Sequence, residues 1–171
     1  GVAQAFPEAQ NTAGKLAKSG KNIKILYGTE GYFVNDVPIW KNSTYKGGTY
    51  VVFDLETTGL DPKCEKITEI GAVRVENGVI TKTFSALVNP MKPIPPNITE
   101  LTGISDDMVK DCPDISDAMP KFLEFCGNAI AVAHNAKFDT SFVKAECEKL
   151  NLEFNNETMD TVELSKEMFP K

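Results

Sequence analysis

The sequence predicts an α/β fold in which a mixed sheet, an antiparallel three-strand meander extended by parallel strands, is flanked by helices. Residues 50–55 form an apolar run typical of a buried strand. Asn77-Gly78, the dipeptide that most strongly indicates a tight β-hairpin, lies between two further strand patterns. An apolar run at 129–133 then leads directly into a helical pattern, which is the strand-then-helix order of an α/β protein.

The remaining elements follow in chain order. The hairpin strands are expected at 67–76 and 79–88, which completes the meander. Asn97-Ile98-Thr99-Glu100 has the spacing of a helix N-cap with a reciprocal glutamate, so a short helix should begin there and end near Gly103. A second helix should start at Ile115 or Ser116. Its buried face would be made of Met119, Phe122, Leu123 and Cys126.

The C-terminal third adds two helices. One is expected at 136–150, with Asn135 as its N-cap and with Phe138, Phe142 and Leu150 on an inward stripe. Another should begin near Thr161. Asp160 is best explained as part of the N-cap region of that last helix, although an acidic residue there could also be considered as a metal ligand.

Composition excludes several classes of protein. The chain has 171 residues, of which 42% are hydrophobic and 25% are charged, which is typical of a globular domain. Its four cysteines are scattered and it has one histidine, so neither a zinc site nor a disulfide framework is supported. No apolar run is long enough to span a membrane and no signal peptide is recognisable. We therefore expect a cytoplasmic protein with no membrane partner.

Charge divides the chain into two expected domains. Residues 1–48 carry six lysines and three acidic residues, about +3, whereas residues 49–171 carry 12 basic and 21 acidic residues, about −9. The polar stretch 41–48 ends in a glycine pair, which suits a junction. An acidic domain is poorly suited to binding a phosphate backbone unaided. If its substrate is a nucleic acid, metal ions must supply much of the positive charge.

Two carboxylates at the end of the first strand predict such a metal site. Asp54 and Glu56 are two positions apart, so their side chains should lie on the same face of the strand. Two unit charges about 4 Å apart, at an effective dielectric of about 20, repel each other by roughly 4 kcal/mol. A divalent cation would remove this repulsion, and an oxygen-only ligand set suits Mg²⁺ or Mn²⁺. A lone Asp-x-Glu pair would more simply be a solvated strand face.

A second chemical signal lies in the segment AVAHNAKFDTSFV. Asp139 follows Phe138 at the edge of the buried face of the predicted helix, so its carboxylate should face a boundary between core and solvent. His134, taken alone, would more often be a packed core histidine than a catalytic group. Asn135, taken alone, would be an ordinary helix cap. The occurrence of these residues together with Asp54 and Glu56 favours a common site.

With both signals in view, the sequence resembles the DEDD superfamily of 3′-to-5′ exonucleases. The Asp-x-Glu of that family is matched by Asp54 and Glu56 in DLETTGL, and its Asn-x-x-x-Asp by Asn135 and Asp139 in HNAKFD. The resemblance covers roughly residues 49–171. It implies a ribonuclease H-like fold and two Mg²⁺ or Mn²⁺ ions, held by Asp54, Glu56 and Asp139 as catalytic residues. The implied substrate is a single-stranded or frayed DNA 3′ end.

The same resemblance implies contacts to the terminal nucleotide. Leu55 and Thr57 would offer backbone or side-chain contacts, and Asn135 belongs to the second motif. The base and sugar would be bordered by Leu60, Leu101, Ile104 and His134. Ordinary packing is an equal alternative for each of these last four residues.

The chain also departs from the family pattern. The third motif, His-x-x-x-x-Asp or Tyr-x-x-x-Asp, supplies a fourth carboxylate and the group that orients the attacking water, but no His or Tyr follows Asp139. We therefore expect a piece cut off before that motif and weakly active or inactive by itself. A catalytically incomplete nucleic-acid-binding module is one alternative. A freestanding exoribonuclease is another, because single sequences do not reveal contacts to a 2′-OH.

The first 48 residues suggest a larger context. They resemble the end of a polymerase-and-histidinol-phosphatase (PHP) domain, in which a Gly-x-Glu supplies a metal ligand, matched here by Gly28-Thr29-Glu30. The His and Asp partners of such a site are absent, so a surface role for Glu30 is simpler. A PHP segment running into an exonuclease is the arrangement of PolC-type DNA polymerase III alpha subunits. This implies proofreading, with the rest of a polymerase chain and other replisome subunits as partners.

Overall fold

The computed structural model describes Lys15, residues 18–20 and residues 48–169. The chain divides into two units, Gly1–Pro38 and Ile39–Lys171, and every strand and helix described below belongs to the second. The PHP-like segment expected at residues 1–48 lies almost wholly outside the described residues. It therefore stays a prediction, as does the role of Glu30.

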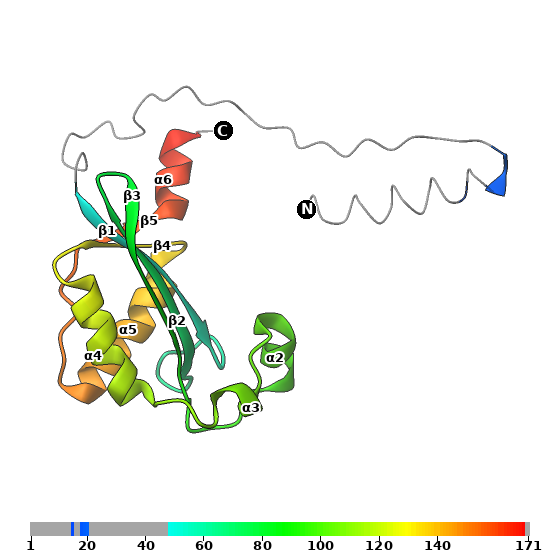
Figure 1. Cartoon of the computed structure of the whole chain (residues 1–171), viewed down its shortest axis with the longest axis horizontal. Helices are drawn as coiled ribbons and strands as arrows, with labels where there is room; N and C mark the ends of the chain where they lie inside the picture. The colour runs from blue at the N-terminus through cyan, green and yellow to red at the C-terminus, as the bar shows by residue number, and fades with distance from the viewer. Residues whose placement is uncertain (1–14, 16–17, 21–47, 170–171) are drawn as a thin grey trace. The chain divides into compact units, whose positions relative to one another are not determined.

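The second unit is built on one five-stranded mixed sheet with the strand order β3-β2-β1-β4-β5 (Figure 1). The meander consists of β1 (Thr49–Thr57), β2 (Ile67–Glu76) and β3 (Val79–Leu87), which pair antiparallel. On the other side of β1 lie β4 (Ile130–Ala133) and β5 (Thr158–Asp160), both paired in parallel. This confirms the predicted α/β class and places β1, the strand with Asp54 and Glu56, at the centre.

The β2–β3 hairpin closes through the predicted turn. Asn77 and Gly78 both have positive φ, 51° and 78°, which is the backbone combination of a type I′ turn. Asparagine and glycine are the residues that adopt this conformation with least strain. The turn sets the pairing of Glu76 with Val79, and with it the register of β2 and β3 beside the turn, up to a shift between Arg74 and Val75.

Helices α4 (Ile115–Cys126) and α5 (Ala136–Leu150) cover one face of the sheet (Figure 1). Residues Val51, Phe53 and Leu55 of β1 are buried toward this layer, whereas Val52 and Asp54 point to the opposite, exposed face. Phe122 of α4 is fully buried and its ring centroid lies 5.3 Å from that of Phe53. The core therefore fixes which face of β1 carries the carboxylates.

The connection from β3 to α4 contains two short helices, α2 (Pro96–Thr102) and α3 (Asp106–Val109). The predicted helix end is confirmed, because Gly103 takes a left-handed φ of 78°. The predicted reciprocal cap is wrong, because the N-cap is Pro95 and no side chain caps the helix. Pro96 already has the φ of a first helical residue, so the helix begins before Asn97.

The last helix, α6 (Thr161–Met168), follows β5 directly, as the sequence predicts. Asp160 is its N-cap residue and its carboxylate accepts a hydrogen bond from the Val162 N–H at 2.8 Å. Among the residues that the structure describes, no helix is long and apolar enough to cross a membrane.

Candidate active site

The exposed face of β1 presents the first two carboxylates. Asp54 is exposed and Glu56 is half-buried, whereas Phe53 and Leu55 between and beside them are buried in the core. The pairing of β1 with β2 shifts register between Glu56 and Thr57. Such irregularities end the regular pairing of a strand and re-aim its side chains, and they are frequent beside active sites. Asp54 and Glu56 therefore lie on one face, just before the strand loses its regular pairing.

The carboxyl group of Glu56 lies in a negative environment. Burial raises its pKa above the ordinary value, and the charges of Asp54 and Glu69 raise it further. Glu69 is the cross-strand partner of Glu56 on β2, and like charges directly opposite each other destabilise a sheet. No sequence pattern points to Glu69, because its contact with Glu56 depends on the register between β1 and β2. A bound cation is one way to offset this repulsion.

Asp139 reaches the same strand from the first turn of α5. Its side chain is only 2% exposed, and its Oδ1 accepts a hydrogen bond from the backbone N–H of Leu55 at 3.1 Å. The third carboxylate is thereby fixed to the residue between Asp54 and Glu56. Burial is the main cause that raises the pKa of Asp139 to about 6, and the charge of Asp54 adds to it.

The donor chemistry of these three residues fits a hard divalent cation. All their ligand atoms are carboxylate oxygens, the type that Mg²⁺ and Mn²⁺ prefer. After burial, the charge of Asp54 is the next cause that raises the pKa of both Glu56 and Asp139. Within residues 48–169 and the few described before them, no three ligand-type side chains are already arranged around one point. Asp54, Glu56 and Asp139 lie near one another, and the side chains of Asp54 and Glu56 would have to turn toward a cation.

The turn that follows β1 is tied down by side chains. Thr57 is buried and donates from its Oγ1 to the Gly59 carbonyl at 2.6 Å, so its hydroxyl serves the turn. The Thr58 hydroxyl donates a hydrogen bond to the Glu65 carboxylate at 2.5 Å, and Glu65 also accepts one from the Lys92 ammonium at 2.8 Å. A Cβ on Gly59 would lie 2.8 Å from Cγ of Glu65, so this position favours glycine.

The residues expected near a nucleotide base differ in exposure. Leu60 and Leu101 are 83% and 80% exposed, which is unusual for large apolar side chains and leaves both available for contact. Ile104 is instead 4% exposed and packs with Ile94 and Val109 in a small second core. Leu55 is also buried, so only its backbone could meet a ligand, and its N–H already bonds Asp139.

The turn between β4 and α5 is stabilised differently from the prediction. Asn135 precedes α5, but it has a left-handed conformation (φ 59°, ψ 52°) and its side chain makes no capping hydrogen bond. The predicted N-cap position is confirmed, but the capping acceptor is the carboxylate of Asp160, which accepts from the Asn135 and Ala136 N–H groups. His134 is exposed, and its Nδ1 lies 3.0 Å from Oγ1 of Thr161.

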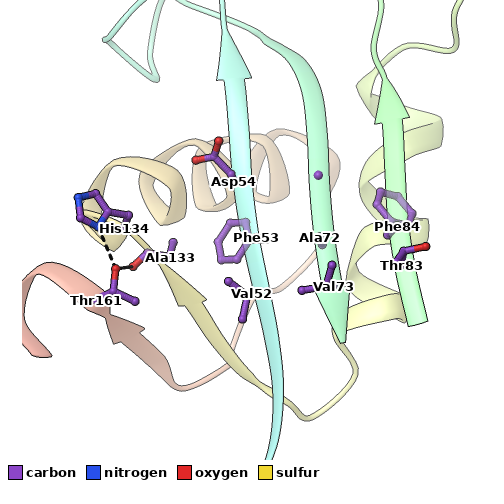
Figure 2. A pocket seen from close by; sticks show the side chains of 11 residues that line it. Val52, Phe53, Asp54, Ala72, Val73, Thr83, Phe84, Ala133, His134 and Thr161 are labelled. Carbon is purple, nitrogen blue, oxygen red and sulfur yellow. Dashed lines mark hydrogen bonds between the residues drawn. The ribbon is translucent and has the colours of Figure 1, made fainter. Parts of the chain in front are cut away.

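A cavity of about 540 Å³ opens on the exposed face of the sheet (Figure 2). It is lined by residues of the three meander strands, including Val52, Asp54 and Val73, and by His134 and Thr161 at its other side. Figure 2 shows the hydrogen bond between His134 and Thr161 at the rim. The cavity brings Asp54 and His134, from the first and second sequence motifs, to one concave surface.

Comparison with known sequences shows which family the chain resembles. The exonuclease family matches residues 51–171. DNA polymerase III of the PolC type from Caldanaerobacter subterraneus subsp. tengcongensis is 47% identical over 171 residues, and that from Clostridium perfringens is 46% identical over 173. These alignments cover 98% and 99% of this chain. The chain spans only 12% of the length of either relative.

Solved structures share the fold. Exonuclease X, in complex with 5′ overhanging duplex DNA, is 34% identical with a TM-score of 0.56, and the match covers 71% of this chain and 64% of that one. Product-bound exonuclease I is 13% identical with a TM-score of 0.64, covering 70% of this chain and 31% of that one. The five-stranded sheet with its flanking helices is the expected ribonuclease H-like fold. Exonucleases of this family generally use divalent metal ions.

Proposed function

We propose, because this chain belongs to the exonuclease family, that it is the proofreading 3′-to-5′ exonuclease segment of a replicative DNA polymerase. The observation that carries the proposal is the hydrogen bond between Asp139 and the Leu55 N–H, which joins the carboxylate of the second motif to the strand of the first. The similarity to PolC-type polymerases over nearly the whole chain supports DNA as the substrate. We also propose a cytoplasmic location, with the rest of a polymerase chain and the replisome as partners.

Asp54, Glu56 and Asp139 would hold two Mg²⁺ or Mn²⁺ ions. When bound, such a pair supplies positive charge to the attacking and leaving oxygens of an in-line phosphoryl displacement. The three carboxylates would keep these ions on the exposed face of β1. Asp139 keeps its orientation through its bond to Leu55, whereas Asp54 and Glu56 are free to turn toward the ions.

The reaction is hydrolysis of the last phosphodiester bond. A water oxygen forms a bond to phosphorus while the bond to the 3′ oxygen of the preceding nucleotide breaks, and the proton of water ends on that oxygen. A nucleoside 5′-monophosphate is released and the strand keeps a free 3′-OH. Leu60 and Leu101, exposed on the turn after β1 and on α2, are proposed to contact the terminal base. His134 and Asn135 would border the sugar and phosphate beside Asp54.

The proposal is tested by mononucleotide release from single-stranded DNA, measured with Mg²⁺ or Mn²⁺ and with EDTA. Since the third motif is missing from its sequence, we expect slow or no release by the 171-residue chain and clear release by a longer chain that continues through that motif. In the longer chain, Asp54→Ala should lower release at least about a hundredfold, because the charge stabilisation it supports is worth several kcal/mol.

Asp117→Ala is the matched control, because it removes an exposed carboxylate on α4, in the helical layer on the other face of the sheet. It should leave release unchanged. Release that survives Asp54→Ala or EDTA would refute the mechanism. Faster release from an RNA 3′ end than from a DNA 3′ end would favour an exoribonuclease instead.

A further inference from the structure

Asp160 is an acidic residue whose position connects three elements. It is the last residue of β5, it lies opposite Ala133 in the parallel β4–β5 pair, and it is the N-cap of α6. Its Oδ1 accepts from the N–H groups of Asn135 at 3.1 Å and Val162 at 2.8 Å. Its Oδ2 accepts from the Ala136 N–H at 3.0 Å. One carboxylate thus satisfies backbone donors at the start of two helices.

The start of α5 depends on this carboxylate. The first N–H groups of a helix have no partner within the helix, and a cap side chain normally supplies one. Asn135 makes no such bond here. Asp160, at the end of β5, supplies the missing acceptor. Because it accepts from the N–H groups of Asn135 and Ala136, it also fixes Asn135 in its left-handed conformation.

Thr161 adds a second connection to the same turn. Its Oγ1 lies 3.0 Å from Nδ1 of His134 and 3.4 Å from the carbonyl oxygen of Ala133. We call Asp160 and Thr161 together the β5–α6 clasp. The clasp contacts four consecutive residues, 133–136, so the last residue of β4 and the first residue of α5 are held by one short segment.

The orientation of α5 decides where Asp139 lies. Asp139 is three residues beyond Ala136, within the first turn of the helix, and its Oδ1 meets the Leu55 N–H at 3.1 Å. A small rotation of that turn would disrupt this bond, because N–H···O hydrogen bonds span about 2.7 to 3.2 Å and weaken steeply when the angle at the hydrogen falls below about 120°. The clasp therefore controls the hydrogen bond between Asp139 and Leu55, although neither of its residues takes part in that bond.

We propose that Asp160 is a positioning residue of this active site, which sets the 135–139 turn so that Asp139 meets β1 between Asp54 and Glu56. The inference rests on the proposed function. Asp160 is not assigned to the metal ions, because both of its oxygens already accept backbone hydrogen bonds. Partners that orient a metal-binding side chain typically contribute 10- to 100-fold to metal affinity or activity, and we expect about tenfold here.

The test compares Asp160→Ala with Asp114→Ala in the 171-residue chain. Asp114 caps α4 in the same way, by accepting from the Ser116 N–H at 2.7 Å, but it lies outside the carboxylate site. Both variants should lose stability, because each loses a helix cap, and Asp160→Ala should lose more because its carboxylate serves the start of two helices. Only Asp160→Ala should weaken Mn²⁺ binding, measured as free Mn²⁺ by electron paramagnetic resonance, by about tenfold.

The amide of Leu55 gives a readout that is independent of metal and activity. Its NMR chemical shift reports the hydrogen bond to Asp139, and Asp139→Ala gives the reference value for loss of that bond. Asp160→Ala should move the shift toward this reference, whereas Asp114→Ala should not. Asp160→Asn keeps one accepting oxygen and should lie between wild type and Asp160→Ala, so it replaces the alanine variant if that one does not fold.

An unchanged Leu55 amide and unchanged Mn²⁺ affinity in a folded Asp160 variant would overturn the proposal. Failure of the proposed function looks different. In that case wild-type Mn²⁺ binding would not depend on Asp54 and a longer chain would release no nucleotide. The Leu55 amide would still show whether Asp160 positions Asp139.

Discussion

The buried charge of Asp139 lowers the free energy of unfolding when no cation is bound. Its side chain is 2% exposed, and burial together with Asp54 raises its pKa from 3.8 to about 6. Between these two pH values the native state binds more protons than the unfolded state, so the free energy of unfolding falls as pH rises. Above about pH 6 the free energy of unfolding is lowered by the full cost of burying the charged Asp139 carboxylate. A divalent cation beside the carboxylates would offset it.

Asp139→Asn should therefore stabilise the metal-free chain at pH 7.5 by about 1 to 3 kcal/mol, because each pKa unit corresponds to about 1.4 kcal/mol. The asparagine Oδ1 can still accept from Leu55, so the contact is kept while the charge is lost. Urea unfolding in EDTA at pH 7.5 and at pH 4 measures the effect, which should largely vanish at pH 4. Asp117→Asn, on the exposed side of α4, is the control.

A metal titration extends the same experiment. Mn²⁺ should raise the free energy of unfolding of the wild type and leave Asp139→Asn much less affected, since a ligand stabilises only the state that binds it. Equal stabilisation of both proteins by Mn²⁺ would contradict the assignment of Asp139 as a metal ligand.

The sequence predicted that Asp54, Glu56 and Asp139 lie near one another, but not what surrounds them. Asp54 and Glu56 follow from strand alternation, and Asp139 from its place beside Phe138 on a helix. The approach of Glu69 to Glu56 and the bond of Asp160 to the start of α5 could not be predicted in this way. Glu69 meets Glu56 only through strand register, and Asp160 meets Ala136 across 24 residues of chain.

The elements follow local sequence closely wherever a local interaction decides them. The β2–β3 hairpin is an example, because Asn77 and Gly78 supply the two positive φ angles that a type I′ turn needs. The ends of α2 and α5 are different. The predicted cap of α2 at Asn97 is wrong, because that helix begins after Pro95. Asn135 is the N-cap residue of α5 as predicted, but a distant aspartate, Asp160, supplies the accepting carboxylate.

Gly78→Ala should destabilise the hairpin by about 1 kcal/mol, because an alanine at φ 78° is strained. Gly71→Ala is a matched control in the neighbouring strand β2. A Cβ there would meet no atom within 4 Å, and no positive φ is required. It should be neutral or slightly stabilising, since it restricts the unfolded chain. Equilibrium urea unfolding of the two variants gives the comparison, and equal losses would contradict the turn argument.

For the whole molecule, the sequence predicted the fold class, including the meander and the parallel extension. The order β3-β2-β1-β4-β5 depends on pairings over long stretches of chain, such as Tyr50 with Ile130, which no local pattern encodes. The site lies where these two kinds of pairing meet. Asp54 and Glu56 belong to the locally paired meander, and Asp139 arrives with β4 and α5.

This topology has a kinetic consequence. Contacts between residues near in sequence form fastest, because little loop entropy is lost. We expect the β1–β3 meander to form first and the three-residue strand β5, at the far edge of the sheet, to dock last. In native-state hydrogen exchange, the amides of β1 and β2 should then exchange at the rate of global unfolding. The amides of Asn135, Ala136 and Val162 should exchange sooner, through partial opening of the β5–α6 clasp. An opening of this kind would separate Asp139 from β1 without unfolding the meander, so the chain could lose its active site while most of its sheet stays folded.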